Sequence, residues 1–223
     1  SDNDENIGLL RYHGSWKFLD QWKWGYGSDI KWTNVKTVNY LENPSEWAWD
    51  LFQSIQFQPS LNFNVKALFK VTTRTDLGWH FPFLLEANSY LGKNKNFKLW
   101  ANVGTDVRFP TLNDRFWFPG GQSNLSPESN IKSSLGNSFR LNLNQHWSWN
   151  QRIELFFNKI DNMILWSPSN KGFFQPINEG EVVAYGANLE EELEWKKKDH
   201  NIVLKTSFSW NRSGNVNKKS AKD

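Results

Sequence analysis

The amino-acid sequence predicts an all-β protein, an antiparallel up-and-down transmembrane β-barrel that is partial here, with about ten strands of a larger barrel. Three observations carry this prediction. Apolar residues recur at every second position, the alternating segments are long, and short and long links between them take turns along the chain.

The alternation is clearest between residues 61 and 71, where Leu61, Phe63 and Val65 are separated by Asn62 and Asn64. A strand points successive side chains to opposite faces, so this segment has one apolar face and one polar face. The same pattern recurs in segments near 8–18, 22–32, 47–57, 79–90, 97–108, 131–143, 147–166, 183–195 and 202–210.

Segment length distinguishes a membrane barrel from a soluble sheet. Strands of soluble sheets have a mode of about five or six residues, whereas a tilted strand that crosses a bilayer needs about 9–11. Many of the alternating segments have ten residues or more. Tryptophans close to segment ends suit the aromatic girdle at a membrane interface: Trp22, Trp24, Trp47, Trp147, Trp149, Trp195 and Trp210.

The links also alternate in length. Short links fall near 19–21, 58–60, 92–96, 144–146 and 197–200, and longer ones near 33–46, 72–78, 108–130, 162–178 and from 211 onward. An up-and-down membrane barrel has short turns at one end and long loops at the other. A soluble antiparallel sandwich or propeller is the alternative, but it gives no reason for this sorting, and no repeat of fixed period is present.

Composition excludes several other classes. With 14 Trp and 17 Phe, the chain is too aromatic for a disordered segment. Its 26 basic and 23 acidic residues are too evenly balanced to indicate a nucleic-acid partner. The absence of Cys excludes disulfides and thiolate metal sites, and no apolar run is long enough for a transmembrane helix.

No constellation of catalytic residues is recognisable, so the sequence predicts neither an enzyme nor a cofactor. The four His are far apart, and no metal-binding pair, Gly-x-Ser-x-Gly elbow or Walker loop is present. Gly120 and Gly121 are interpreted as a turn. A carboxylate stripe is interpreted as lining a polar lumen and meeting basic residues, for which Arg108, Arg140 and Arg152 are candidates; the stripe comprises Glu190, Glu192 and Glu194.

Residues 107–136 closely resemble the signature region of TonB-dependent outer-membrane receptors. The segment from Arg108 to Phe116 is similar to the family's Arg/Lys-x-Pro-Thr/Ser-Leu stretch, and Gly121 to Glu128 resembles its Gly-Asn-Pro-Asn-Leu-x-Pro-Glu stretch. Residues 156–164 and 178–190 resemble two further family motifs in the family's order. The chain departs from the family pattern at Ser123, Arg115 and Asn188, which leaves the subfamily open.

The resemblance implies that residues 1–223 are part of a receptor barrel of about 22 strands, with a plug domain that is absent from this chain. It further implies the outer membrane of a Gram-negative bacterium, with lipid around the barrel. The implied activity is import of a scarce, large solute, a small molecule or metal chelate such as siderophore–iron or cobalamin. The energy would come from the TonB complex, acting through the missing plug.

The residues expected to select the ligand are aromatic and basic side chains in two long links, which would be extracellular. Exposed aromatic side chains are frequent binding anchors, although they can instead pack one loop against another. The first link offers Arg115, Phe116, Trp117 and Phe118, and the second offers Trp166, Phe173 and Phe174.

Two other functions remain open at this point. A passive outer-membrane porin or an adhesin-like barrel would share the alternation of long strands, and a plug-encoding segment upstream would distinguish it from a receptor. A barrel enzyme such as a lipase or protease would need a catalytic constellation, which the sequence does not show.

Overall fold

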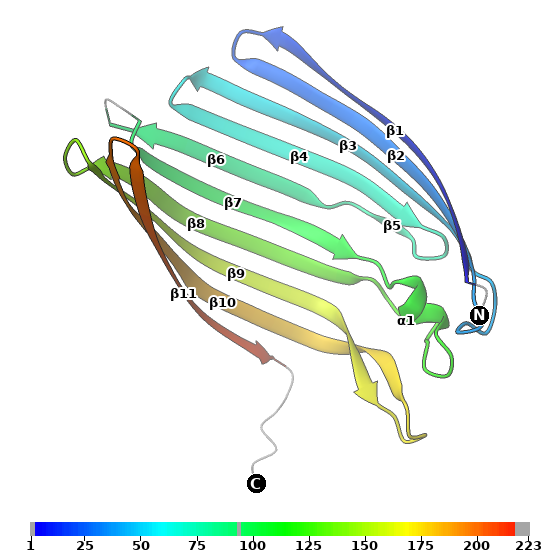
Figure 1. Ribbon diagram of the computed structural model, residues 1–223. Helices are drawn as coiled ribbons and strands as arrows, with labels where there is room; N and C mark the ends of the chain where they lie inside the picture. The colour runs from blue at the N-terminus through cyan, green and yellow to red at the C-terminus, as the bar shows by residue number, and fades with distance from the viewer. Residues whose placement is uncertain (1–2, 93–94, 217–223) are drawn as a thin grey trace.

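The computed structural model describes residues 3–92 and 95–216, which form one antiparallel sheet of 11 strands (Figure 1). The strands follow one another in space in the order β1-β2-β3-β4-β6-β7-β8-β9-β10-β11, and β5 pairs only with β4. Their bounds are β1 Asp4–Leu19, β2 Trp22–Lys36, β3 Ser45–Ser60, β4 Phe63–Arg74, β5 Trp79–His80, β6 Phe83–Leu91, β7 Phe97–Arg108, β8 Glu128–Asn142, β9 Trp147–Pro168, β10 Phe174–Lys197 and β11 His200–Asn215.

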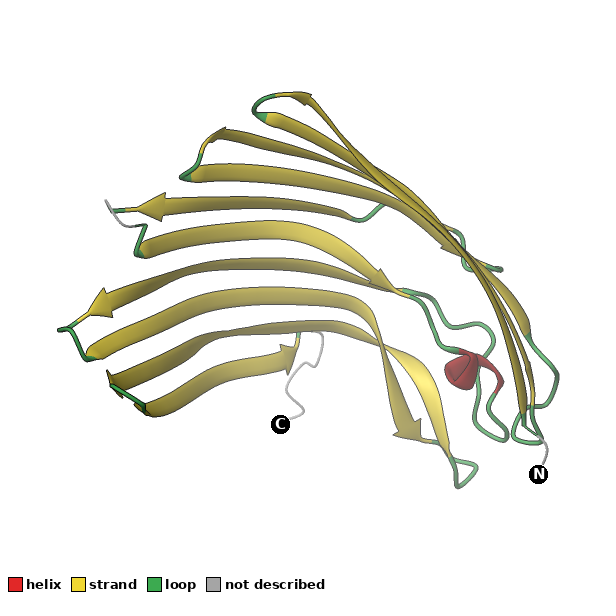
Figure 2. Cartoon of the chain, turned by 45° about the horizontal axis from the view of Figure 1, so that its top comes forward, coloured by secondary structure: helices red, strands yellow, loops and turns green. Residues whose placement is uncertain are grey.

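The sheet is bent into an open trough (Figures 1 and 2). Among the described residues, β1 pairs only with β2 and β11 pairs only with β10, so the trough is not closed. The all-β, up-and-down antiparallel prediction and the predicted number of strands are therefore confirmed.

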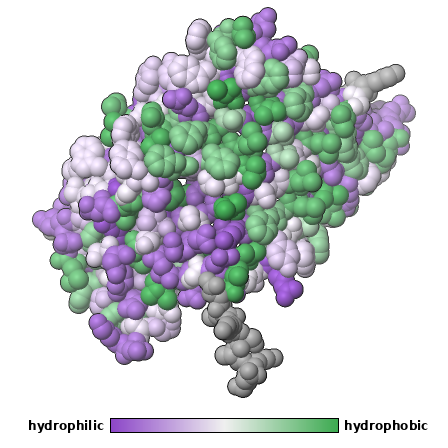
Figure 3. Space-filling model, turned by 180° about the vertical axis from the view of Figure 1, so that it is seen from behind, coloured by the Kyte–Doolittle hydropathy of each residue, from purple (hydrophilic) through white to green (hydrophobic). Residues whose placement is uncertain are grey.

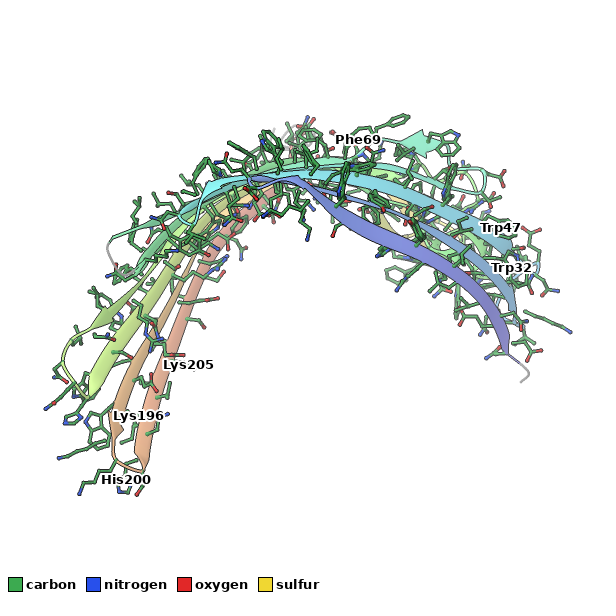
Figure 4. The ribbon with its side chains drawn as sticks, turned by 90° about the horizontal axis from the view of Figure 1, so that it is seen from above. Trp32, Trp47, Phe69, Lys196, His200 and Lys205 are labelled. Carbon is green, nitrogen blue, oxygen red and sulfur yellow. The ribbon has the colours of Figure 1, made fainter. Side chains whose placement is uncertain are left out.

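The two faces of the trough differ in polarity as the alternation predicted. Trp32, Trp47 and Phe69 point out from the convex side, whereas Lys205 points into the concave side (Figure 4). The register joins apolar residues of neighbouring strands into continuous rows across the convex face, for example Ile55, Ala67, Leu85 and Val103. Figure 3 shows this face, with hydrophobic side chains gathered over the middle of the sheet.

On the polar concave face, aromatic rings lie across glycines of the adjacent strand. Trp100 pairs with Gly136, and a side chain at Gly136 would overlap the indole ring. The guanidinium of Arg152 covers the same ring at 4.3 Å, which leaves Trp100 only 8% exposed. An aromatic residue can thus occupy the polar parity because the glycine opposite makes room for it.

The links are sorted by length between the two ends of the trough, as predicted. At one end lie the short turns, which include 20–21, 61–62, 143–146 and 198–199. At the other end lie the longer links 37–44, 75–82, 109–127 and 169–173. The helix α1 (Leu112–Phe116) lies within the third of these, and no helix in the described part of the chain is long and apolar enough to cross a membrane.

Two boundaries differ from the prediction. Residues 162–178, predicted as a long link, mostly continue β9 and β10 as a protruding hairpin whose tip is residues 169–173. Pro176 lies in this hairpin, where β10 pairs with β9 but not with β11. Proline has no backbone N–H, and on this side of β10 there is no neighbouring strand to which an N–H would have to donate. The link predicted from 211 begins later, because β11 continues to Asn215, and residues 217–223 lie outside the described part.

The tryptophans predicted for a girdle lie at strand ends with one exception. Trp22 and Trp147 are the first residues of β2 and β9, and Trp47 is the third residue of β3. Trp210 lies well inside β11, so it does not mark an end.

Candidate functional site

The link between β7 and β8, residues 109–127, is called here the α1 loop. It contacts the link between β2 and β3: Phe118 donates its backbone N–H to the carbonyl oxygen of Asn39 at 2.8 Å, and Trp117 pairs with Tyr40 as an isolated bridge. Strands β4 and β6 separate these links in the curved sheet. A contact between them must therefore cross the concave side, so the α1 loop lies in the mouth of the trough (Figure 2).

A capping box builds the short helix of this loop. The Thr111 hydroxyl accepts from the Asp114 N–H, while the Asp114 carboxylate accepts from the Thr111 N–H at 2.9 Å and from its hydroxyl at 2.8 Å. The same carboxylate accepts from the Trp166 indole N–H at 2.9 Å. Because Asp114 is only 4% exposed, it joins the α1 loop to the β9–β10 hairpin away from water.

Arg108 and Glu128 hold the base of the loop. The Arg108 guanidinium donates to Glu128 and lies 3.7 Å from Asp114. Glu128 also accepts from the Ile164 N–H at 2.7 Å, which connects the start of β8 to β9. Several residues of the family-like motifs are thus structural connections between β7, the loop and the hairpin.

Asn178 makes a second connection to the loop, from the hairpin side. Its side-chain amide donates to the carbonyl oxygens of Ser126 at 2.9 Å and Asn162 at 2.8 Å, and its side-chain oxygen accepts from the Ser126 N–H at 2.9 Å.

Gly120 permits the closest approach of the loop to the hairpin. A side chain at this position would overlap the carbonyl oxygen of Phe174 and would lie 3.2 Å from the Trp166 ring. The glycine pair was correctly interpreted as part of a loop, and its reason is this contact between backbones.

The side chain of Arg115 is buried, so its charge is not exposed at the surface of the mouth. It is 8% exposed, its guanidinium lies 3.4 Å from the carboxylate of Glu46, and it covers the Phe116 ring at 4.9 Å. The arginine that departs from the family pattern therefore ties the α1 loop to the start of β3, and its geometry is that of a buried ion pair.

The other predicted ligand residues divide by exposure. Phe116 and Phe173 are half-buried. Four aromatic side chains are exposed by 38–58%, and we call them the mouth aromatics: Trp117, Phe118, Trp166 and Phe174. They belong to the two predicted links, which the structure brings into contact. Their part in ligand binding stays a prediction.

The sequence did not indicate the contribution of the β2–β3 link. The Tyr40 hydroxyl donates to Asn113, and burial raises the pKa of Tyr40 above its ordinary value, so the hydroxyl remains a donor. Nothing in the local sequence pairs Tyr40 with Asn113, or Glu46 with Arg115. The Thr111-x-x-Asp114 spacing of a capping box was a signal that could have located α1.

The carboxylate stripe lies on the concave face, and two of its members, Glu192 and Glu194, meet basic residues. Of the three arginines predicted as partners, Arg140 alone is one of these basic residues. Glu194 lies 3.8 Å from Arg140, and Glu192 lies 2.9 Å from Lys205. Arg152 instead pairs with Glu154, and Arg108 pairs with Glu128.

These features together define a segment of a membrane β-barrel that has an apolar outer face and a loop, the α1 loop, folded into its mouth. The chain belongs to the TonB-dependent receptor β-barrel family, since the family model described as "TonB dependent receptor-like, beta-barrel" matches residues 12–223.

The chain is similar to two curated relatives, both named vitamin B12 transporter BtuB. That of Photobacterium profundum is 34% identical over 98 residues, which covers 41% of this chain and 15% of the relative. That of Vibrio vulnificus is 30% identical over 129 residues, which covers 49% of this chain and 20% of the relative. The chain thus spans a fifth or less of these relatives.

Among solved structures, the siderophore receptor PirA from Pseudomonas aeruginosa superimposes with a TM-score of 0.72 at 14% sequence identity. The match covers 94% of this chain and 47% of the PirA chain. This likeness concerns the fold.

Proposed function

We propose that the protein containing this chain is an outer-membrane receptor that imports a scarce, large solute in a TonB-dependent manner. The observation that carries the proposal is the α1 loop, which is held inside the mouth of the trough and exposes aromatic side chains there. A loop fastened by the Arg115–Glu46 ion pair, the buried Asp114 carboxylate and a capping box suits a preorganised binding surface, because little ordering remains for the ligand to induce.

The proposed ligand is a small molecule or metal chelate, such as cobalamin or siderophore–iron. Such ligands present large, rigid surfaces, and Trp and Phe side chains bury much area at low cost in conformational entropy. The names of the relatives, a vitamin B12 transporter and a siderophore receptor, support this class.

The proposed location is the outer membrane of a Gram-negative bacterium, with lipid against the convex face. The proposed energy source is the TonB complex, which would act through a plug domain of the full-length protein. The carboxylate and basic side chains of the concave face would then face that plug.

The proposal is tested by deleting the gene and measuring uptake of cyanocobalamin and of ferric siderophores, with and without a protonophore. We expect energy-dependent uptake of at least one solute to be lost and to return with the wild-type gene. Unchanged uptake of every solute contradicts a receptor, and uptake that persists without an energised inner membrane favours the passive porin.

The mouth is tested separately with the double variant Trp117→Ala/Phe118→Ala in the full-length protein. Truncating two exposed anchors should weaken ligand binding by about tenfold or more, measured by titration of the purified receptor. Phe69→Ala, which removes an exposed ring of the convex face, is the matched control and should leave affinity unchanged.

A further inference from the structure

Between the row that contains Trp195 and the row that contains Ala187, four polar side chains interrupt the apolar convex face of β8–β11. We call them the lipid-face patch: Asn137, Gln151, Glu191 and Thr206. The register places Gln151 opposite Glu191, and Glu191 opposite Thr206. Asn137 of β8 lies opposite Ile153, which is the next residue after Gln151 on the same face of β9, toward the long links. The patch therefore spans four neighbouring strands.

Apolar side chains flank Gln151, Glu191 and Thr206 on both sides. Toward the short turns lies the row Trp149, Leu193 and Leu204, and toward the long links lies the row Ile153, Leu189 and Phe208. On the inner strands β8 and β9, Leu135 and Leu155 of the next row are 56% and 53% exposed, as side chains that face lipid would be. By contrast, no convex-face position of β3, β4, β6 or β7 carries a charged side chain.

The depth of the patch follows from the tryptophans at the short-turn end. Trp147 and Trp195 lie opposite each other with ring centroids 6.5 Å apart, as members of an interfacial girdle would. Glu191 is four residues from Trp195 on the same face. At about 3.4 Å per residue and a tilt of about 40°, it lies roughly 10 Å further into an apolar band about 25 Å tall.

Hydrocarbon offers these groups no hydrogen bonds. The Gln151 amide donates to the Glu191 carboxylate at 3.1 Å, which is the only side-chain hydrogen bond of the patch within the described residues. Within the part of the chain that the structure describes, one amide N–H of Gln151, one carboxyl oxygen of Glu191, the Asn137 amide and the Thr206 hydroxyl make no side-chain hydrogen bond. Polar side chains that face lipid are costly, so a protein surface that satisfies them is favoured over lipid.

We propose that the lipid-face patch is a contact with a second copy of the same protein. Two copies in one membrane are related by an axis along the membrane normal, so each residue meets the other copy at the same height. The patch is self-complementary, because it carries carboxyl and amide acceptors together with amide and hydroxyl donors. The flanking apolar rows exclude water from the contact, which strengthens its hydrogen bonds.

The experiment uses the full-length protein in liposomes, with donor- and acceptor-labelled copies mixed over a series of lipid dilutions. Energy transfer between copies measures the dissociation constant of the dimer. The test variant is Glu191→Leu, which suits a lipid-facing position and therefore permits folding. The matched control is Glu190→Leu, which replaces the neighbouring carboxylate on the concave face.

We expect the wild type and Glu190→Leu to dimerise alike, and Glu191→Leu to raise the dissociation constant by about tenfold or more. A monomeric wild type would overturn the proposal, as would a Glu191→Leu variant that dimerises as well as the wild type. An equal loss in both variants would also overturn it. Ligand binding by the mouth is measured on the same samples and tests the proposed function independently.

Discussion

Replacing Asp114 by Ala should release the α1 loop from the mouth while leaving the sheet intact. The carboxylate accepts from the Thr111 N–H at 2.9 Å, from the Thr111 hydroxyl at 2.8 Å and from the Trp166 indole N–H at 2.9 Å. Ala removes all three bonds, including half of the capping box. Arg108 keeps Glu128 as its partner, so the ends of β7 and β8 stay joined.

The expected magnitude follows from these contacts. At about 1 kcal/mol for each hydrogen bond, the three sum to about 3 kcal/mol, and the loss of the helix cap falls within that sum. This free energy opposes local opening of the loop and not unfolding of the sheet. Since about 1.4 kcal/mol corresponds to a factor of ten, opening of the loop should become roughly 100-fold more frequent.

Amide hydrogen exchange of the full-length protein in lipid measures this opening directly. Amides of residues 112–117 should exchange roughly 100-fold faster in Asp114→Ala, while those of β7 and β8 keep their protection. Glu42→Ala, which removes an exposed carboxylate from the neighbouring link, is the control and should change neither. Exchange within threefold of wild type, or an equal rise throughout β7 and β8, would refute the reasoning.

Two further pairs of variants test the packing. Gly136→Val should lower the free energy of unfolding by about 1–3 kcal/mol, measured in denaturant, because its side chain overlaps the Trp100 ring. A Cβ atom at Gly214 has no other atom within 4 Å, so Gly214→Val, the control, should leave the free energy of unfolding unchanged. An equal loss of stability in both variants would contradict this account. Arg115→Leu leaves the half-buried Glu46 carboxylate without its ion-pair partner and should weaken the loop by about 1–3 kcal/mol, seen as faster proteolysis. Lys205→Leu, the control, breaks the ion pair with Glu192, whose lysine is 72% exposed, and should leave proteolysis nearly unchanged. Proteolysis as fast as in Arg115→Leu would disprove the difference expected between a buried and an exposed ion pair.

The sheet was predictable because its determinants are local. Alternation with period two assigns each side chain to a face, and the length of each alternating run sets the length of the strand. Even so, the alternation did not predict the position of Trp100, an aromatic residue at a position where the pattern expects a polar side chain. Its place depends on Gly136 in the next strand, a pairing that only the register reveals.

The mouth was predictable only as a set of candidates. The sequence pointed to two links rich in aromatic residues, and the structure brings these links into contact through Asp114 and Trp166. It did not indicate that Arg115 would be buried. The ion pair of Arg115 with Glu46 joins residues 69 positions apart, and no periodicity relates residues at that separation.

By itself, the sequence determined the class of sheet, the polarity of its two faces, the sorting of its links and the resemblance to a receptor family. These features follow from interactions between a residue and its immediate surroundings, which are apolar on one side of a strand and aqueous on the other. Only the tertiary structure decided which side chains meet across the mouth and which residues of neighbouring strands lie side by side on each face. Both depend on the register and curvature of the whole sheet, which bring together residues distant in sequence.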